Sequence, residues 1–142
     1  MHNEMEIRFL SLSGNEGFAR AAAAAFASQM DPEIEELSDI RTAVSEAVTN
    51  AIIHGYEQQT DRIVVLQMEI DNDMLTVVVK DDGCGIGDIE LARKPFFTSK
   101  PELERSGMGF SVMEAFMDSV DVRSEVHVGT TVTMRKRIMH AN

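Results

Sequence analysis

The chain has 142 residues, of which 44% are apolar, so it is long and apolar enough to bury one hydrophobic core. Its net charge of −11 argues against nucleic-acid binding, because a protein that binds a duplex needs a basic face. No apolar run approaches the roughly 20 residues that cross a bilayer, and the start lacks a signal peptide. The lone Cys84 has no partner for an internal disulfide. We therefore expect a cytoplasmic protein without a nucleic-acid or membrane partner.

The first half of the chain predicts one strand and two helices. Residues 5–12 alternate between apolar and polar and predict a strand. Ser13 and Glu16 have the spacing of a capping box, which predicts that a helix begins there. A second helix is predicted to start at Pro32 and to end at Gly55, in the left-handed conformation that glycine favours. Its apolar positions recur at intervals of three and four: Ile34, Leu37, Ile40, Val44, Val48, Ala51 and Ile52.

The second half predicts four strands and one helix. The predicted elements are a strand at 62–70, a strand through Leu75, Val77 and Val79, a helix at about 108–117, and strands at 119–124 and 130–137. Asp81 has the same parity as Val79, so it points to the buried face if that strand continues. The element order predicts an α/β (α+β) two-layer sandwich with a mixed, mainly antiparallel sheet covered on one face by helices. We expect a single domain over residues 1–142.

Three polar residues follow one side of the second predicted helix, at Glu46, Asn50 and His54. One interpretation is an ordinary solvated helix face. The other is a magnesium site, because Mg²⁺ takes few protein ligands and an asparagine carbonyl oxygen can be one of them. In that case a carboxylate one turn away would orient or deprotonate an attacking hydroxyl.

Asp81 opens a glycine-rich loop that contains Gly83 and Gly85. A carboxylate buried at a strand end needs a hydrogen-bond donor, and the exocyclic amine of adenine is one. Such a pocket would reject guanine, which has a carbonyl at that position. The glycines would let a ligand approach the backbone closely. Taken alone, the segment is better interpreted as a simple turn, and it matches neither a Rossmann fingerprint nor a P-loop.

A basic segment leads into the predicted helix at 108–117. Lys100 and Arg105 belong either to a solvated loop or to a strap over a polyanion such as a triphosphate. Ser106, Gly107 and Gly109 lie where the helix begins. Free backbone amides and the positive end of a helix make this position suitable for phosphate.

Together, these segments resemble the ATP-binding fold shared by DNA gyrase B, Hsp90, histidine kinases and MutL proteins. The matching segments are Glu46-x-x-x-Asn50 with Ala51 and His54, Asp81-x-Gly83-x-Gly85, Phe96-Phe97, Gly107-x-Gly109 and Gly129-Thr130. They span nearly the whole chain. We expect neither a phospho-accepting helix pair nor a transducer domain beside them. The chain is therefore most similar to the anti-sigma factor serine kinases of bacteria, above all to their sporulation branch.

This resemblance implies an activity and a set of partners. Such proteins are homodimers that bind an RNA polymerase sigma factor and keep it from the polymerase. With Mg-ATP they phosphorylate a serine of a small antagonist protein, which then no longer displaces the sigma factor. The implied cofactors are ATP or ADP and Mg²⁺.

The resemblance also implies roles for single residues. Glu46 would be the general base and Asn50 the magnesium ligand. Asp81, with Thr130, would fix adenine. The remaining assignments are Gly83 and Gly85 in the nucleotide loop, Ser106, Gly107 and Gly109 at the phosphates, and Arg105 and Lys100 at the charge of the transferred phosphoryl group.

Glu16 and Arg20 lie one turn apart on the first predicted helix, beside a run of alanines. They form either a solvated ion pair worth about 0.3–0.5 kcal/mol or part of a docking face for a partner protein. Two further functions stay open for the whole chain. One is a binding module that ATP switches without phosphotransfer, and the other is a detached catalytic domain of a histidine kinase.

Overall fold

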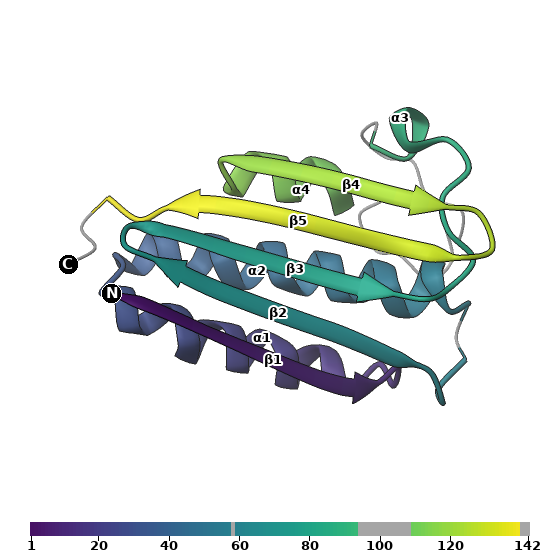
Figure 1. Cartoon of the computed structure of the whole chain (residues 1–142), viewed down its shortest axis with the longest axis horizontal. Coiled ribbons are helices and arrows are strands. Elements are labelled where there is room, and N and C mark those ends of the chain that lie inside the picture. Colours follow the sequence, from purple (N-terminus) through teal and green to yellow (C-terminus); the bar gives the residue numbers. More distant parts are fainter. Residues whose placement is uncertain (58, 94–108, 140–142) are drawn as a thin grey trace.

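Five strands form one sheet, and helices lie against one of its faces (Figure 1). The computed structural model describes residues 1–57, 59–93 and 109–139. The elements are β1 (His2–Leu10), α1 (Asn15–Ala27), the 3-10 helix η1 (Ser28–Met30), α2 (Ile34–Asn50), the π-helix η2 (Ala51–Gly55), β2 (Ile63–Asp71), β3 (Met74–Asp81), α3 (Ile89–Ala92), α4 (Gly109–Phe116), β4 (Ser119–Glu125) and β5 (Gly129–Arg137). This confirms the predicted two-layer sandwich.

The strands lie in the order β1-β2-β3-β5-β4. All four neighbouring pairs are antiparallel, so within the described residues the sheet is antiparallel throughout, and not mixed as predicted. β2 and β3 form one hairpin, and β4 and β5 form another. The sheet therefore has β1 at one edge and β4 at the other.

The alternation of residues along the strands sets the inner face of the sheet. The predicted inward positions are buried, namely Val64, Leu66, Met68 and Ile70 in β2 and Leu75, Val77 and Val79 in β3. Burying each such side chain contributes about 1.5–3 kcal/mol. Asp81 continues this inner face at the end of β3, as its parity predicts.

Small side chains let the first two helices approach each other closely. Ala19 and Ala23 of α1 are fully buried, as is Ala43 of α2. The core between helices and sheet is completed by α4, which packs against α2. Among the described residues, no helix has both the length and the apolar composition that crossing a bilayer requires.

The starts of the two long helices differ from their predictions. The capping box of Ser13 and Glu16 does not form, because α1 begins one residue after Gly14 and the Glu16 carboxylate contacts Ser45 and Arg20 instead. In α2 the Glu33 amide donates to the Glu36 side chain at 2.9 Å, so the helix begins after Pro32.

For one residue of the apolar pattern on α2, Ile34, the predicted burial is wrong. Ile34 is the first residue of the helix and is 90% exposed. Asp31, three residues earlier, adopts a left-handed conformation with φ 54°. From Ile40 onward the predicted stripe is buried.

Candidate functional site

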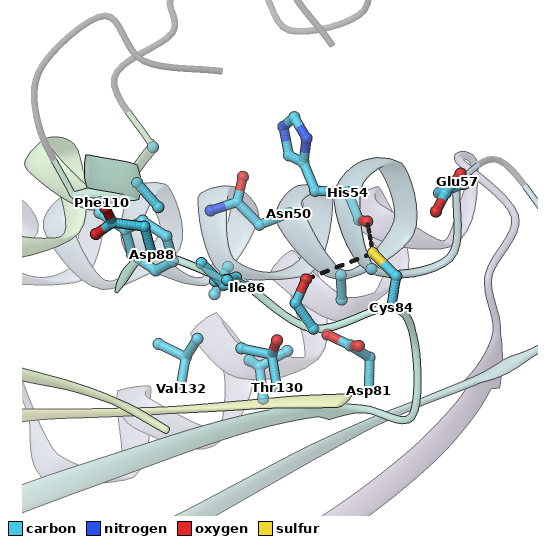
Figure 2. A pocket seen from close by; sticks show the side chains of 18 of the residues that line it. Asn50, His54, Glu57, Asp81, Cys84, Ile86, Asp88, Phe110, Thr130 and Val132 are labelled. Carbon is cyan, nitrogen blue, oxygen red and sulfur yellow. Dashed lines mark hydrogen bonds between the residues drawn. The ribbon is translucent and has the colours of Figure 1, made fainter. Parts of the chain in front are cut away.

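A cavity of about 410 Å³ lies between the helical layer and one end of the sheet (Figure 2). The ends of β3 and β5 contribute Asp81, Thr130 and Val132, and the opposite side is formed by Asn50 and His54. The loop after β3 and the start of α4 complete the lining. This volume lies in the range of small-molecule and cofactor sites.

Asp81 is the buried carboxylate of this cavity. It is 8% exposed, and the Gly83 amide donates a hydrogen bond to its Oδ1 at 2.9 Å. Burial, the main cause, raises the pKa of Asp81 to about 6; the neighbouring charge of Asp82 acts in the same direction, while the amides of Gly83 and Thr130 oppose it. At neutral pH the side chain is therefore largely ionised, and it offers hydrogen-bond acceptors at the cavity wall.

Thr130 lies directly opposite Asp81 in the pairing of β3 with β5. It is buried and lines the cavity, and its hydroxyl lies 2.8 Å from the Ser124 hydroxyl. Thr130 and Val132 share the buried side of β5, and Val132 lines the cavity beside it. A hydroxyl and a carboxylate stand side by side against an apolar wall.

Gly55 ends the helical segment for a reason that the sequence did not reveal. Its φ is not in the left-handed region, so the predicted closing conformation is wrong. A Cβ at this position would lie 2.7 Å from the Asp81 carboxylate. Glycine is needed here because the helix backbone and the carboxylate approach each other closely.

The two loop glycines are likewise held against the chain itself. A Cβ at Gly83 would lie 2.0 Å from the Gly55 carbonyl oxygen. Gly85 has φ +75°, and a Cβ there would lie 2.2 Å from the Glu125 carbonyl oxygen. Gly85 lines the cavity, whereas Gly83 is not part of the lining. Because neither glycine has a side chain, the loop after Asp81 can pack closely against Gly55 and Glu125.

The π-helix η2 and Tyr56 after it hold this loop in place. The Tyr56 hydroxyl accepts a hydrogen bond from the Asp82 amide at 2.7 Å and donates one to the Ile63 carbonyl oxygen. Tyr56 is buried, and burial raises the pKa of its hydroxyl. Short π-helical turns occur often at functional sites. Here the turn brings the helix end and the Asp81 loop into contact.

Of the three polar residues predicted on one side of the second helix, two lie at the cavity and one does not. Asn50 and His54 line the cavity. Glu46 is half-buried one turn before Asn50 and lies outside the lining. Gly109, the first described residue of α4, lines the cavity next to Phe110.

Four predicted residues lie outside the described part of the chain. They are Lys100, Arg105, Ser106 and Gly107, from the basic segment and the glycine box. Phe96 and Phe97 lie outside it as well. Their assignments remain predictions.

The sequence matches the histidine kinase-like ATPase domain over residues 14–136. It is 56% identical over 138 residues to the anti-sigma F factor of Clostridium perfringens strain SM101, covering 97% of this chain and 99% of that one. The anti-sigma F factor of Geobacillus sp. strain WCH70 is also 56% identical, with 97% of this chain and 94% of the relative covered. The chain belongs to the anti-sigma F factor family. Its ATPase domain implies nucleotide binding.

A solved structure supports the fold of this anti-sigma F factor family member. The RsbU and RsbW domains of a Mycobacterium tuberculosis protein match with a TM-score of 0.70 and 19% identity. The match covers 96% of this chain but only 32% of that longer chain. At this identity the likeness concerns the fold alone.

The cavity of this family member also contains residues that the sequence did not single out. Cys84 donates a hydrogen bond from its Sγ to the His54 carbonyl oxygen at 3.0 Å, and burial raises the pKa of its thiol (Figure 2). Ile86 and Leu91 contribute apolar lining from the loop and α3. No local pattern marks these residues, because their position depends on how the loop folds back over the cavity.

Glu16 and Arg20 lie away from the cavity on α1. The Arg20 Nη1 is 3.4 Å from the Glu16 Oε1, so the predicted ion pair forms. Ser45 of α2 donates its hydroxyl to the same carboxylate oxygen. Glu16 therefore links α1 to α2 and fixes the position of the partly exposed Arg20.

Proposed function

We propose that the chain is an anti-sigma factor and an ATP-dependent protein serine kinase. In this proposal it sequesters an RNA polymerase sigma factor. With Mg-ATP it also phosphorylates a serine of a small antagonist protein and thereby inactivates it. The names of relatives at 56% identity over nearly their whole length support the anti-sigma role. The buried Asp81 carboxylate in the wall of the cavity of an ATPase-family chain is the observation that carries the nucleotide site.

The lining of the cavity fits adenine. Asp81 has acceptor capacity beyond its bond to Gly83, and the exocyclic amine of adenine would donate to it. Thr130 lies opposite Asp81 and lines the same cavity, so its hydroxyl would share in this recognition, and Val79 and Val132 would contact the ring. Guanine would place a carbonyl against the ionised carboxylate, so we expect strong preference for ATP over GTP.

Asn50 is the proposed magnesium ligand, since it is a neutral oxygen donor in the lining of the cavity. The ion, bound together with ATP, would offset the negative charge of the phosphates. Glu46, one helical turn before Asn50, would take the proton of the serine hydroxyl as the serine oxygen bonds to the γ-phosphorus and ADP leaves. Lys100, Arg105, Ser106, Gly107 and Gly109 are the proposed contacts of the phosphates.

The proposed partner surface includes Glu16 and Arg20. Its support is the fixed, partly exposed guanidinium on α1, on a helix of small residues. Arg20→Glu should abolish binding of the sigma factor or the antagonist and leave ATP affinity unchanged. Parallel loss of both affinities would contradict the assignment. By family resemblance we also propose that the 142 residues act as one kinase domain, as a homodimer in the cytoplasm.

The experiment for the proposed function follows the γ-phosphate of labelled Mg-ATP. The full chain and an Asn50→Ala variant are each incubated with a candidate antagonist protein from the same bacterium, and ATP binding is measured in parallel. We expect acid-stable label on the antagonist with the natural chain and none with the variant. Acid-labile label would instead indicate a detached histidine-kinase domain. Intact ATP binding without any transfer would indicate a binding module that ATP switches.

A further inference from the structure

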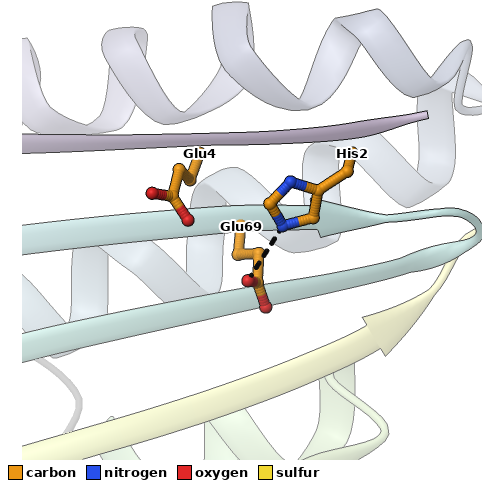
Figure 3. Close-up of side chains that lie close together, drawn as sticks. All are labelled: His2, Glu4 and Glu69. Carbon is orange, nitrogen blue, oxygen red and sulfur yellow. Dashed lines mark hydrogen bonds and ion pairs between the residues drawn. The ribbon is translucent and has the colours of Figure 1, made fainter.

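Three potential metal ligands meet on the outer face of the sheet, at the start of β1 (Figure 3). His2 and Glu4 are two residues apart on one strand and so share a face. Glu69 of β2 lies directly opposite Glu4 in the strand pairing. The ligand atoms of all three side chains lie within 4.8 Å of one another.

The charges of this cluster favour a bound cation. Two carboxylates directly opposite each other in an antiparallel pair destabilise it. In the described part of the chain, His2 is the only ion-pair partner shown for Glu69, with 3.2 Å between its Nε2 and the Glu69 Oε2. A chain with a net charge of −11 adds a general attraction for cations.

We propose that His2, Glu4 and Glu69 bind one divalent transition-metal ion, with Zn²⁺ as the best match. Imidazole nitrogen favours zinc over magnesium or calcium, whose sites are built from oxygen. Tetrahedral zinc with bonds of about 2.0–2.1 Å separates its ligand atoms by roughly 3.3 Å. The His2 to Glu69 distance already meets this value, and a rotation of the exposed Glu4 side chain completes the set.

The surroundings leave room for further ligands. An open hollow of about 460 Å³ adjoins the cluster, and both Glu4 and Glu69 belong to its lining. Water would fill the remaining coordination position there. The ion would join the edge strand β1 to β2 on the outer face, whereas the cavity with Asp81 lies on the inner face. The inference is therefore independent of the proposed kinase function.

The test is a titration of Zn²⁺ into the metal-free, full-length chain without a histidine tag, in competition with a chromophoric zinc indicator. We expect one zinc per chain, and an affinity lowered on the order of 10-fold or more in His2→Ala and in Glu69→Gln. The matched control is His127→Asn, which changes an exposed histidine at the β4–β5 turn. Asparagine suits the left-handed conformation there, with φ 67°. This control should keep the affinity of the natural chain.

A melting curve with and without zinc provides a second readout. Zinc should raise the Tm of the natural chain and of His127→Asn, because an ion that binds only the folded chain stabilises it. It should not raise the Tm of His2→Ala, which lacks one of the three ligands. Equal zinc affinity in His2→Ala and the natural chain would overturn the proposal. The absence of any zinc binding by the natural chain would overturn it as well.

Discussion

The inner faces of β3 and β5 serve two different purposes along their length. The paired residues Val77 and Met134 are buried and apolar, as are Val79 and Val132 next to them. The next inner pair on the same two strands is Asp81 with Thr130. The strand geometry is the same, but at this last inner position a carboxylate and a hydroxyl replace the apolar pairs, next to Val79 and Val132, which already line the cavity.

The comparison shows that the same strand alternation builds the core and positions Asp81 at the cavity. It also shows that burying the charge of Asp81 lowers the stability of the fold. The alternation that buries Val77 and Val79 also buries Asp81. Burial raises the pKa of Asp81 to about 6, so ionisation at neutral pH opposes folding by up to about 3 kcal/mol. A ligand that donates to this carboxylate would recover part of that free energy.

The largest effect on stability is expected at the buried apolar pairs of β3 and β5. Met134→Ala removes a side chain that is fully buried, so we expect the free energy of unfolding to fall by about 2–5 kcal/mol. The ATP affinity of the folded protein should stay within about twofold. Denaturant unfolding and calorimetric ATP titration measure the two quantities. The control is Thr133→Ala, next to Met134 but on the outer face, and a similar loss of stability in it would break the comparison.

Asp81→Asn should act on stability in the opposite sense. The folded-state pKa of Asp81, about 6, lies above its ordinary value of 3.8. Its protonated form therefore favours folding below about pH 4, and this contribution is lost as the pH rises through about 6. Without nucleotide, we expect the variant to gain up to about 3 kcal/mol at pH 7.5 and almost nothing at pH 4.

Unfolding of both proteins in denaturant at the two pH values measures this gain. The exposed neighbour provides the control, since Asp82→Asn should change stability far less. If Asp81→Asn is destabilised equally at both pH values, burial of the charge is not the dominant cost at this position.

A smaller effect is expected at Tyr56, which joins the end of the helical segment to the Asp81 loop and to β2. Tyr56→Phe keeps the buried ring and removes the hydrogen bonds to the Asp82 amide and the Ile63 carbonyl. Each such bond contributes about 0.5–1.5 kcal/mol, so ATP affinity should fall roughly fivefold as the Asp81 loop loosens. Faster hydrogen exchange of the Asp82 amide should accompany this fall. Unchanged exchange would mean that the hydroxyl does not hold the loop.

The sequence predicts which strand residues face the core, because an alternation with a period of two residues is a local signal. It placed Asp81 on the inner face and gave the order of the main elements. The helix starts were less predictable. Glu16 had the spacing of a cap, yet its carboxylate contacts Ser45 on another helix. Such a contact depends on tertiary packing, which spacing along one helix does not contain.

The lining of the cavity was predictable where a residue type alone suggests chemistry, as for Asn50 and Asp81. It was not predictable where the reason is a contact between distant segments. Gly55 matched the pattern of a helix end, but its role is to leave space for the Asp81 carboxylate. Cys84 lines the cavity only because the loop folds back onto the π-helix.

The central claim is that Asp81 accepts a hydrogen bond from the amine of adenine. It is tested most directly by comparing ATP with purine riboside triphosphate, which lacks that amine, on the natural chain and on Asp81→Ala. A hydrogen bond to a charged group contributes about 1.5–3 kcal/mol, so loss of the amine should weaken binding to the natural chain roughly 10- to 100-fold. Asp81→Ala should bind the two nucleotides with nearly equal affinity. An equal preference for ATP in both proteins would contradict the account.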